Sequence, residues 1–154
     1  MQPSISLRPI AAVLALLMST CALAADVQAP ASVHQDALTP AREAIKAERW
    51  PDAIKLLEQA AEKSPNNADA FNLLGFSHRK AGALDRAFKH YKTALALDPN
   101  HKGAHEYIGE AYLLAGDFKQ AQSHLKQLER LCPQGCEERD DLQRAIAAAR
   151  AKKQ

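Results

Sequence analysis

Residues 68–101 read ADAFNLLGFSHRKAGALDRAFKHYKTALALDPNH, and residues 102–135 read KGAHEYIGEAYLLAGDFKQAQSHLKQLERLCPQG. When the two stretches are aligned, small residues match small residues, bulky residues match bulky ones, and the prolines coincide. The same register extends back into residues 34–67, and it gives the matched sets Ala41/Gly75/Gly109, Trp50/Leu84/Phe118, Ala53/Ala87/Ala121, Leu57/Tyr91/Leu125 and Pro65/Pro99/Pro133. A fixed period of 34 residues indicates a chain built from repeated supersecondary units.

Each copy of the repeat predicts two helices. Apolar residues recur at three- and four-residue spacing, which is typical of amphipathic helices. Gly82 and Gly116 are expected to end the first helices, because glycine adopts a left-handed C-cap at little cost. A proline follows each second helix and stops it. The predicted pairs are 39–48 with 51–63, 68–81 with 84–97, and 102–115 with 118–131, with Thr39 as the first N-cap and Pro40 as the first helical residue.

The composition supports an all-α globular protein. The 154 residues suffice for one domain, and 47% apolar with 25% charged residues is a globular composition. Alanine is abundant and β-branched runs are few, which favours helices over a sheet. The net charge of +2, with no run of five like charges, lacks the basic footprint of a nucleic-acid-binding protein. We therefore expect no nucleic-acid partner.

The second and third copies resemble the tetratricopeptide repeat (TPR). The pattern of this repeat has an aromatic residue, Leu-Gly and a second aromatic residue, followed by Ala, an aromatic residue and Pro. In the second copy the matching residues are Phe71, Leu74, Gly75, His78, Ala87, Tyr91 and Pro99. The third copy supplies His105, Ile108, Gly109, Tyr112, Ala121, Leu125 and Pro133. The resemblance implies a right-handed α-solenoid of three TPR helix pairs, which are residues 34–67 (degenerate), 68–101 and 102–135. Residues 136–154, amphipathic from 137 to 152, are expected to form a C-terminal capping helix.

The resemblance also implies partner binding. First helices line the concave wall of such a stack, and walls of this kind bind protein or peptide segments. From the register we predict that these side chains face the groove: Leu38, Arg42, Ile45, Asp69, Asn72, Phe76, Arg79, Glu106, Glu110 and Leu113. Phe76 is the expected apolar anchor. The basic residues of the set lie toward the N-terminal end of the stack, and Glu106 and Glu110 lie toward the other end. We therefore expect the groove to be positively charged at one end and negatively charged at the other.

Residues 1–24 have the features of a secretory signal peptide. Arg8 precedes the uncharged run 9–25, which is too short to span a bilayer, and Ala22-Leu23-Ala24 forms a cleavage site. Cleavage would leave a periplasmic protein without stable membrane insertion and with a flexible lead-in over 25–33. The alternative is a lipoprotein anchored through Cys21, which the preceding Thr20 disfavours.

Cleavage also leaves two cysteines, Cys132 and Cys136, and an even count outside the cytoplasm predicts a structural disulfide. The alternatives are a redox pair, for which C-x-x-C is the usual spacing, and a metal site that adds His101 and His105. Packing explains the histidines more simply, because two of them replace aromatic residues of the repeat. His90 and His124 occupy equivalent positions on second helices. No metal or cofactor is expected.

Motifs of catalysis are absent from the sequence, among them a nucleophile elbow, a phosphate-binding loop and a zinc-protease signature. We therefore expect a non-catalytic periplasmic scaffold or adaptor that binds a protein segment. The alternative hypothesis is a periplasmic redox- or metal-handling protein that uses Cys132 and Cys136.

Overall fold

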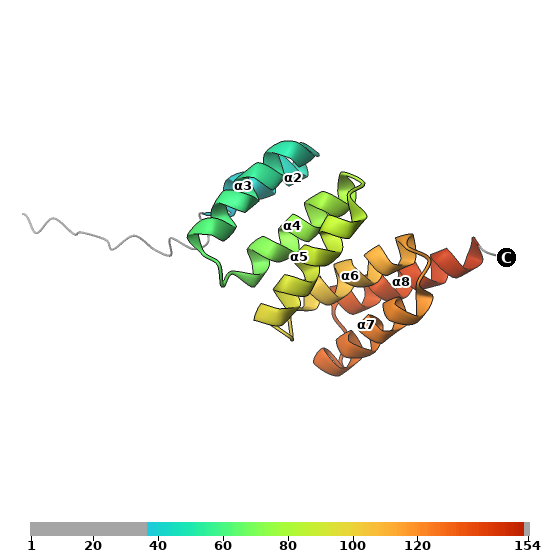
Figure 1. Cartoon of the computed structure of the whole chain (residues 1–154). Coiled ribbons are helices and arrows are strands. Elements are labelled where there is room, and N and C mark those ends of the chain that lie inside the picture. The colour runs from blue at the N-terminus through green and yellow to red at the C-terminus, as the bar shows by residue number, and fades with distance from the viewer. Residues whose placement is uncertain (1–36, 153–154) are drawn as a thin grey trace, which may run out of the picture. The chain divides into compact units, whose positions relative to one another are not determined.

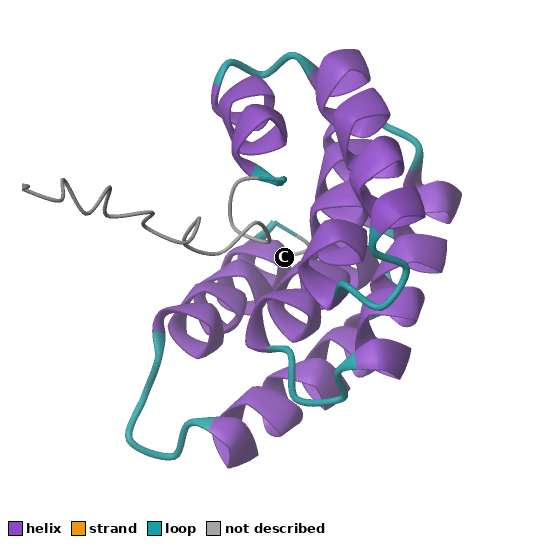
Figure 2. Ribbon diagram, turned by 90° about the vertical axis from the view of Figure 1, so that its left-hand side faces the viewer, coloured by secondary structure: helices purple, strands orange, loops and turns teal. Residues whose placement is uncertain are grey.

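A computed structural model of the protein describes residues 37–152, and all regular structure in this range is helical. The helices are α2 (Thr39–Lys46), α3 (Trp50–Lys63), α4 (Ala68–Lys80), α5 (Leu84–Leu97), α6 (Lys102–Leu114), α7 (Phe118–Leu131) and α8 (Glu137–Ala151). They pack as consecutive pairs, with α8 against α6 and α7, to form an α-solenoid (Figure 1), and short loops join them (Figure 2). Within this range no helix has both the length and the apolar composition of a membrane span. The predicted signal peptide and lead-in lie outside the described residues.

The helix boundaries agree with the prediction to within two residues. Gly82 and Gly116 have φ angles of 79° and 78°, which is the left-handed conformation expected after α4 and α6. Two details differ in α2. Leu38, and not Thr39, is its N-cap, and the helix ends at Lys46 because Glu48 takes a positive φ of 54° in the following turn.

Small residues of the repeat lie where helices approach one another closely. A Cβ atom on Gly75 would lie 2.4 Å from Cδ1 of Tyr91, and one on Gly109 would lie 2.6 Å from Cδ2 of Leu142. Both large side chains are fully buried. The space beside Gly75 in α4 is therefore filled by Tyr91 of α5, the second helix of the same pair. The space beside Gly109 in α6 is filled by Leu142 of α8.

The first core cluster corrects one sequence prediction. Leu38 is only 4% exposed and packs with Leu57 and Leu74, while Ile45 packs against the same cluster. Leu38 therefore does not face the groove. The repeat register failed here because Leu38 precedes α2, and a residue outside the helix does not follow helical periodicity.

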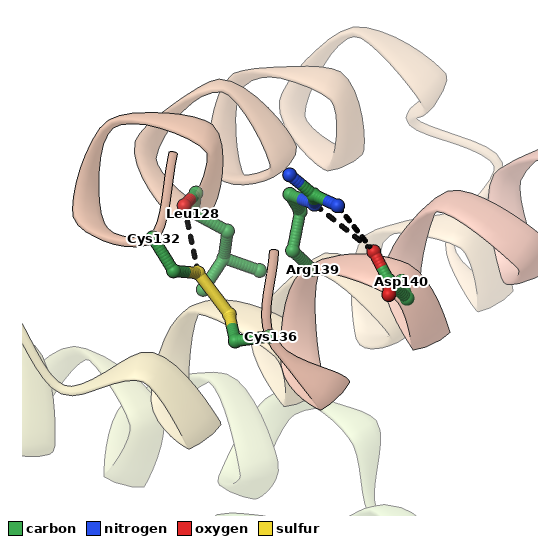
Figure 3. The surroundings of a disulfide bond; sticks show 5 residues. All are labelled: Leu128, Cys132, Cys136, Arg139 and Asp140. Carbon is green, nitrogen blue, oxygen red and sulfur yellow. Dashed lines mark hydrogen bonds and ion pairs between the residues drawn. A yellow bond between two sulfur atoms is a disulfide. The ribbon is translucent and has the colours of Figure 1, made fainter. Parts of the chain in front are cut away.

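A disulfide bond between Cys132 and Cys136 closes the turn between α7 and α8, and their Cα atoms lie 5.9 Å apart (Figure 3). Gly135 has a φ of 103°, and its N–H donates to the carbonyl oxygen of Cys132, so the chain reverses between the cysteines. Figure 3 also shows the sulfur of Cys132 against the carbonyl oxygen of Leu128, 3.1 Å away. The bond joins the residue that ends α7 to the residue that caps α8, and so limits the angle at which α8 docks.

Candidate functional site

The first helices α4 and α6 and the capping helix α8 lie in a row, with α4 against α6 and α6 against α8. Residues spaced by seven and eleven positions fall on one stripe of an α-helix, because 3.6 residues make a turn. We call the surface formed by these stripes the first-helix face, and its residues are Asp69, Phe76 and Lys80 of α4, Gly103, Glu110 and Leu114 of α6, and Glu138, Ala145 and Ala149 of α8.

Besides Leu38 and Ile45, which pack in or against the first core cluster, the structure places the other eight predicted groove residues at three depths. Arg42 and Asp69 are exposed, Phe76, Arg79, Glu110 and Leu113 are half-buried, and Asn72 and Glu106 are buried. The two buried side chains are not accessible to a partner. The register assigned helix faces from one helix at a time, and it could not include the neighbouring helices that cover these two residues.

Arg79 is held by contacts within the protein. Its Nη2 lies 2.7 Å from Oε2 of Glu110, and its Nε donates to the hydroxyl oxygen of Tyr91 at 3.3 Å. The guanidinium carbon also lies 5.4 Å from the ring centroid of Phe76 and 5.7 Å from that of Tyr107. Because Arg79 and Glu110 neutralise each other between adjacent helices, the expected charge polarity along the stack is wrong at this point.

Phe76 is covered by its own chain. Its ring centroid lies 5.0 Å from that of Tyr107 on α6 and 6.1 Å from that of Trp50 at the start of α3. The ammonium group of Lys80 lies 5.6 Å from the Phe76 ring. Phe76 thus does not require a partner to cover it, contrary to the sequence-based argument, and its role as a binding anchor stays a prediction.

Asn72 and Glu106 face neighbouring helices. The amide nitrogen of Asn72 lies 3.2 Å from where a Cβ on Gly103 would stand, so the absent side chain makes room for it. Glu106 is 8% exposed and lies near carboxylates of its own helix and of α8. Burial, followed by the charge of Glu110, raises the pKa of Glu106 to about 8. At neutral pH its carboxyl group is therefore mainly protonated, and it adds no charge to the surface.

The pKa of Glu106 predicts a specific pH dependence. Because folding raises this pKa above the usual value of about 4.5, the folded state holds the proton more tightly, and stability falls as pH rises from about 4.5 to 8. Glu106→Gln mimics the protonated group. We expect the variant to match the wild type at pH 5 and to exceed its free energy of unfolding at pH 9 by about 1–2 kcal/mol, after allowance for solvent screening.

Urea denaturation at the two pH values checks this prediction, with Glu129→Gln as the control because Glu129 is exposed on α7. The control should follow the wild type at both pH values. A Glu106→Gln variant that also follows the wild type at pH 9 would show that the buried carboxyl group ionises without cost.

A pocket of ≈ 510 Å³ lies at the C-terminal ends of α4, α6 and α8. We call it the C-end pocket, and it is lined by Arg79, Lys80, Glu110, Leu113, Leu114, Phe118, Ala145, Ala148, Ala149 and Lys152. Leu114 is 66% exposed, an unusual exposure for a leucine beside a concave surface. Sequence reasoning missed Leu114, although a signal existed: two adjacent leucines at the end of a helix cannot both face the core.

A second pocket of ≈ 450 Å³ lies at the opposite, N-terminal ends of the same helices. We call it the N-end pocket, and it is lined by Asn66, Asn67, Ala68, Asp69, Asp98, Asn100, His101, Lys102, Gly103 and Glu138. His101 accepts the N–H of Ala104 through Nδ1, so its Nε2 carries the hydrogen and donates to Oδ1 of Asp69 at 3.1 Å. This contact fixes the N-terminus of α6 against that of α4.

Four other histidines of the described range form two equivalent ring clusters. His90 on α5 stacks on Phe71 and His78 of α4, and His124 on α7 lies against His105 and Tyr112 of α6. Burial, followed by the charge of the neighbouring histidine, lowers the pKa of both His90 and His124 to about 4. At neutral pH these side chains are therefore uncharged rings, and their ring contacts agree with the packing role expected from the sequence.

The nitrogens of His101 and His105 do not converge on a common point. The carbonyl oxygen of Pro99 can only accept, so Nε2 of His105 carries its hydrogen, and Nδ1 accepts from Nδ1 of His124 at 2.9 Å. Residues 37–152 contain no group of three or more His, Cys, Asp or Glu side chains placed to hold a metal ion. The two sulfurs of Cys132 and Cys136 are bonded to each other.

Solved structures of TPR domains have the same fold. The TPR2B domain of yeast Sti1, in its pHsp70 complex, has a TM-score of 0.70 at 16% identity, with 77% of this chain and 96% of that chain covered. The Yersinia enterocolitica type III secretion chaperone SycD, in complex with a peptide of the translocator YopD, has a TM-score of 0.67 at 19% identity (78% and 94% covered). The first TPR of Spaghetti (RPAP3), bound to the HSP90 peptide SRMEEVD, has a TM-score of 0.66 at 18% identity (76% and 92% covered).

No curated protein matches the sequence. Two models of the tetratricopeptide repeat match it, one over residues 38–102 and the other over residues 78–146. Together they span most of the described range and all three helix pairs. The repeat period, the helix pairs and these matches agree, and the chain belongs to the tetratricopeptide repeat family.

Proposed function

We propose that the protein is an exported, non-catalytic scaffold that binds a segment of a partner protein on its first-helix face. The observation that carries this proposal is the C-end pocket, in which the first helices α4 and α6 and the capping helix α8 surround ≈ 510 Å³ and leave Leu114 66% exposed. An apolar concavity of this size suits the side chain of a bound protein segment. The structural neighbours that were solved with a bound peptide or partner support this reading.

The proposed location is the periplasm, and it rests on the sequence of residues 1–24. The turn between α7 and α8 agrees with this location, because a disulfide persists in an oxidising compartment. In the exported protein we expect the disulfide to hold the capping helix α8, which supplies one wall of the C-end pocket, in its docked position.

Site-specific photo-crosslinking in the source cell tests the function. A photoreactive amino acid replaces Leu114 in the full-length chain, and a second version carries it at Lys126, which is exposed on α7. We expect a discrete crosslinked adduct from position 114 and none from position 126. Equal adducts at both positions, or none at either, would contradict binding on the first-helix face.

A further inference from the structure

We infer that the bound segment carries a basic residue at one end and, about five residues away, a large apolar residue next to an acidic one, and that it lies along the axes of α4, α6 and α8. This inference rests on the proposed function, since it assigns the chemistry of the segment that the first-helix face would bind. Three features of that face carry it: the position of the two pockets on shared stripes, the apolar lining of one pocket, and the opposite charges of the two.

The N-end and C-end pockets lie on one face of the same three helices. Each helix contributes one residue to the N-end pocket and, eleven positions later in the sequence, one residue to the C-end pocket. These pairs are Asp69 and Lys80 on α4, Gly103 and Leu114 on α6, and Glu138 and Ala149 on α8. Eleven residues rise about 16 Å along an α-helix. An extended segment advances about 3.3 Å per residue, so about five residues connect the two pockets.

The C-end pocket is apolar at its centre. Ala145, Ala148 and Ala149 form one side, and their small side chains leave a depression on α8. Leu113 and Leu114 of α6 form the opposite side. This lining suits one large aliphatic or aromatic side chain, which would bury the exposed part of Leu114.

The rim of the C-end pocket is positively charged. Arg79, Lys80 and Lys152 stand against one carboxylate, Glu110, and Arg79 already neutralises that carboxylate at 2.7 Å. Lys80 and Lys152 make no ion pair with any residue of the described range. A carboxylate of the partner, next to its apolar residue, would pair with these two ammonium groups.

The N-end pocket has the opposite charge. Its carboxylates are Asp69, Asp98 and Glu138, and Lys102 is its lysine. Glu138 makes no ion pair within the described range, and Asp69 is bound to one ring nitrogen of His101. A lysine or arginine of the partner would complement this pocket. Between the pockets, Arg79 and Glu110 neutralise each other.

The probe for the test is a phage library of random 12-residue peptides, selected on the purified exported protein. We expect enriched peptides to combine Lys or Arg with a large apolar residue flanked by Asp or Glu, about five residues apart. The best peptide is then synthesised, and its dissociation constant is measured by fluorescence anisotropy for the wild type and for charge-reversal variants.

The N-end reversal is Asp69→Lys with Glu138→Lys, and the C-end reversal is Lys80→Glu with Lys152→Glu. Each reversal is expected to weaken binding of the selected peptide by about tenfold. The variant that combines both reversals should bind a peptide whose basic and acidic residues are exchanged more tightly than it binds the original peptide. The matched control is Lys119→Glu with Lys126→Glu on α7, outside both pockets. Acidic and basic residues near helix ends also stabilise their own helices, so affinities are compared per folded molecule. If the Asp69→Lys change prevents folding, Glu138→Lys alone represents the N-end pocket.

The outcomes separate this inference from the proposed function. Two results would overturn the inference and leave the binding face in place. One is that the enriched peptides lack the charge pattern. The other is that both reversals leave the affinity unchanged while Leu114→Ser abolishes it. The proposal of a binding face would be overturned as well if no peptides were enriched. It would also be overturned if neither Leu114→Ser nor the two reversals changed the affinity. Loss of affinity with each reversal and recovery with the exchanged peptide would support both.

Discussion

Replacing Gly75 with valine is expected to lower the free energy of unfolding by about 3 kcal/mol, because the added atoms overpack a filled core. Even the first added carbon would lie 2.4 Å from Cδ1 and 2.9 Å from Cγ of Tyr91. That ring is fully buried, and its hydroxyl group is bound by Arg79, so it has no open space to move into. Urea denaturation monitored by circular dichroism measures the loss.

A double-mutant cycle with Tyr91→Leu tests the cause. Leucine removes the ring that the valine would strike, so the double variant should be more stable than the sum of the two single losses predicts. Additive losses would mean that the valine acts by another route than contact with Tyr91. Gln59→Val provides the control for helix propensity, because Gln59 is exposed in α3.

Replacing Arg79 with methionine is expected to lower the free energy of unfolding by about 2–3 kcal/mol, since it leaves a half-buried carboxylate without its partner. The side chains of Arg79 and Glu110 are 10% and 26% exposed, and the guanidinium also contacts Tyr91, Phe76 and Tyr107. Methionine keeps most of the apolar stem and removes the charge. Thermal and urea denaturation provide the measurement.

Arg49→Met is the matched control, because its ion pair with Asp52 is exposed, with side chains 60% and 59% accessible. Exposed pairs contribute about 0–1 kcal/mol, so this variant should stay near the wild type. The double variant Arg79→Met with Glu110→Gln should recover part of the loss, since it removes the unpaired charge. Equal losses for Arg79→Met and Arg49→Met would show that the network around Arg79 adds no stability beyond a surface pair.

The helices were predictable because their limits depend on local chemistry. Gly82 ends α4 and Pro99 follows α5 for reasons that act within a few residues of the chain. The small residues at positions such as Gly75 recur in each repeat and lie where helices approach closely, although the sequence alone did not indicate which side chain would fill the space. That choice depends on the size of residues in other helices, here Tyr91 and Leu142.

The candidate site was predictable only in part. The helical register predicted that Asp69 and Glu110 face the groove, and the structure has them lining the N-end and the C-end pocket. It could not show that Asn72 and Glu106 are covered, because their cover comes from Gly103 and from the packing of α8 on α6. The pockets were not predictable either, since each combines the ends of three helices that are far apart in the chain.

The different side chains that fill the spaces beside Gly75 and Gly109 restrict which repeat can stand directly before the terminal helix. A copy of residues 68–101 inserted in place of residues 102–135 would put a tyrosine at the position of Leu125, aimed at a glycine whose neighbouring space Leu142 already fills. The duplicated tyrosine and the terminal helix would then compete for one volume. The last repeat and its terminal helix are therefore fitted to each other, and a different last repeat would require a different residue at the position of Leu142.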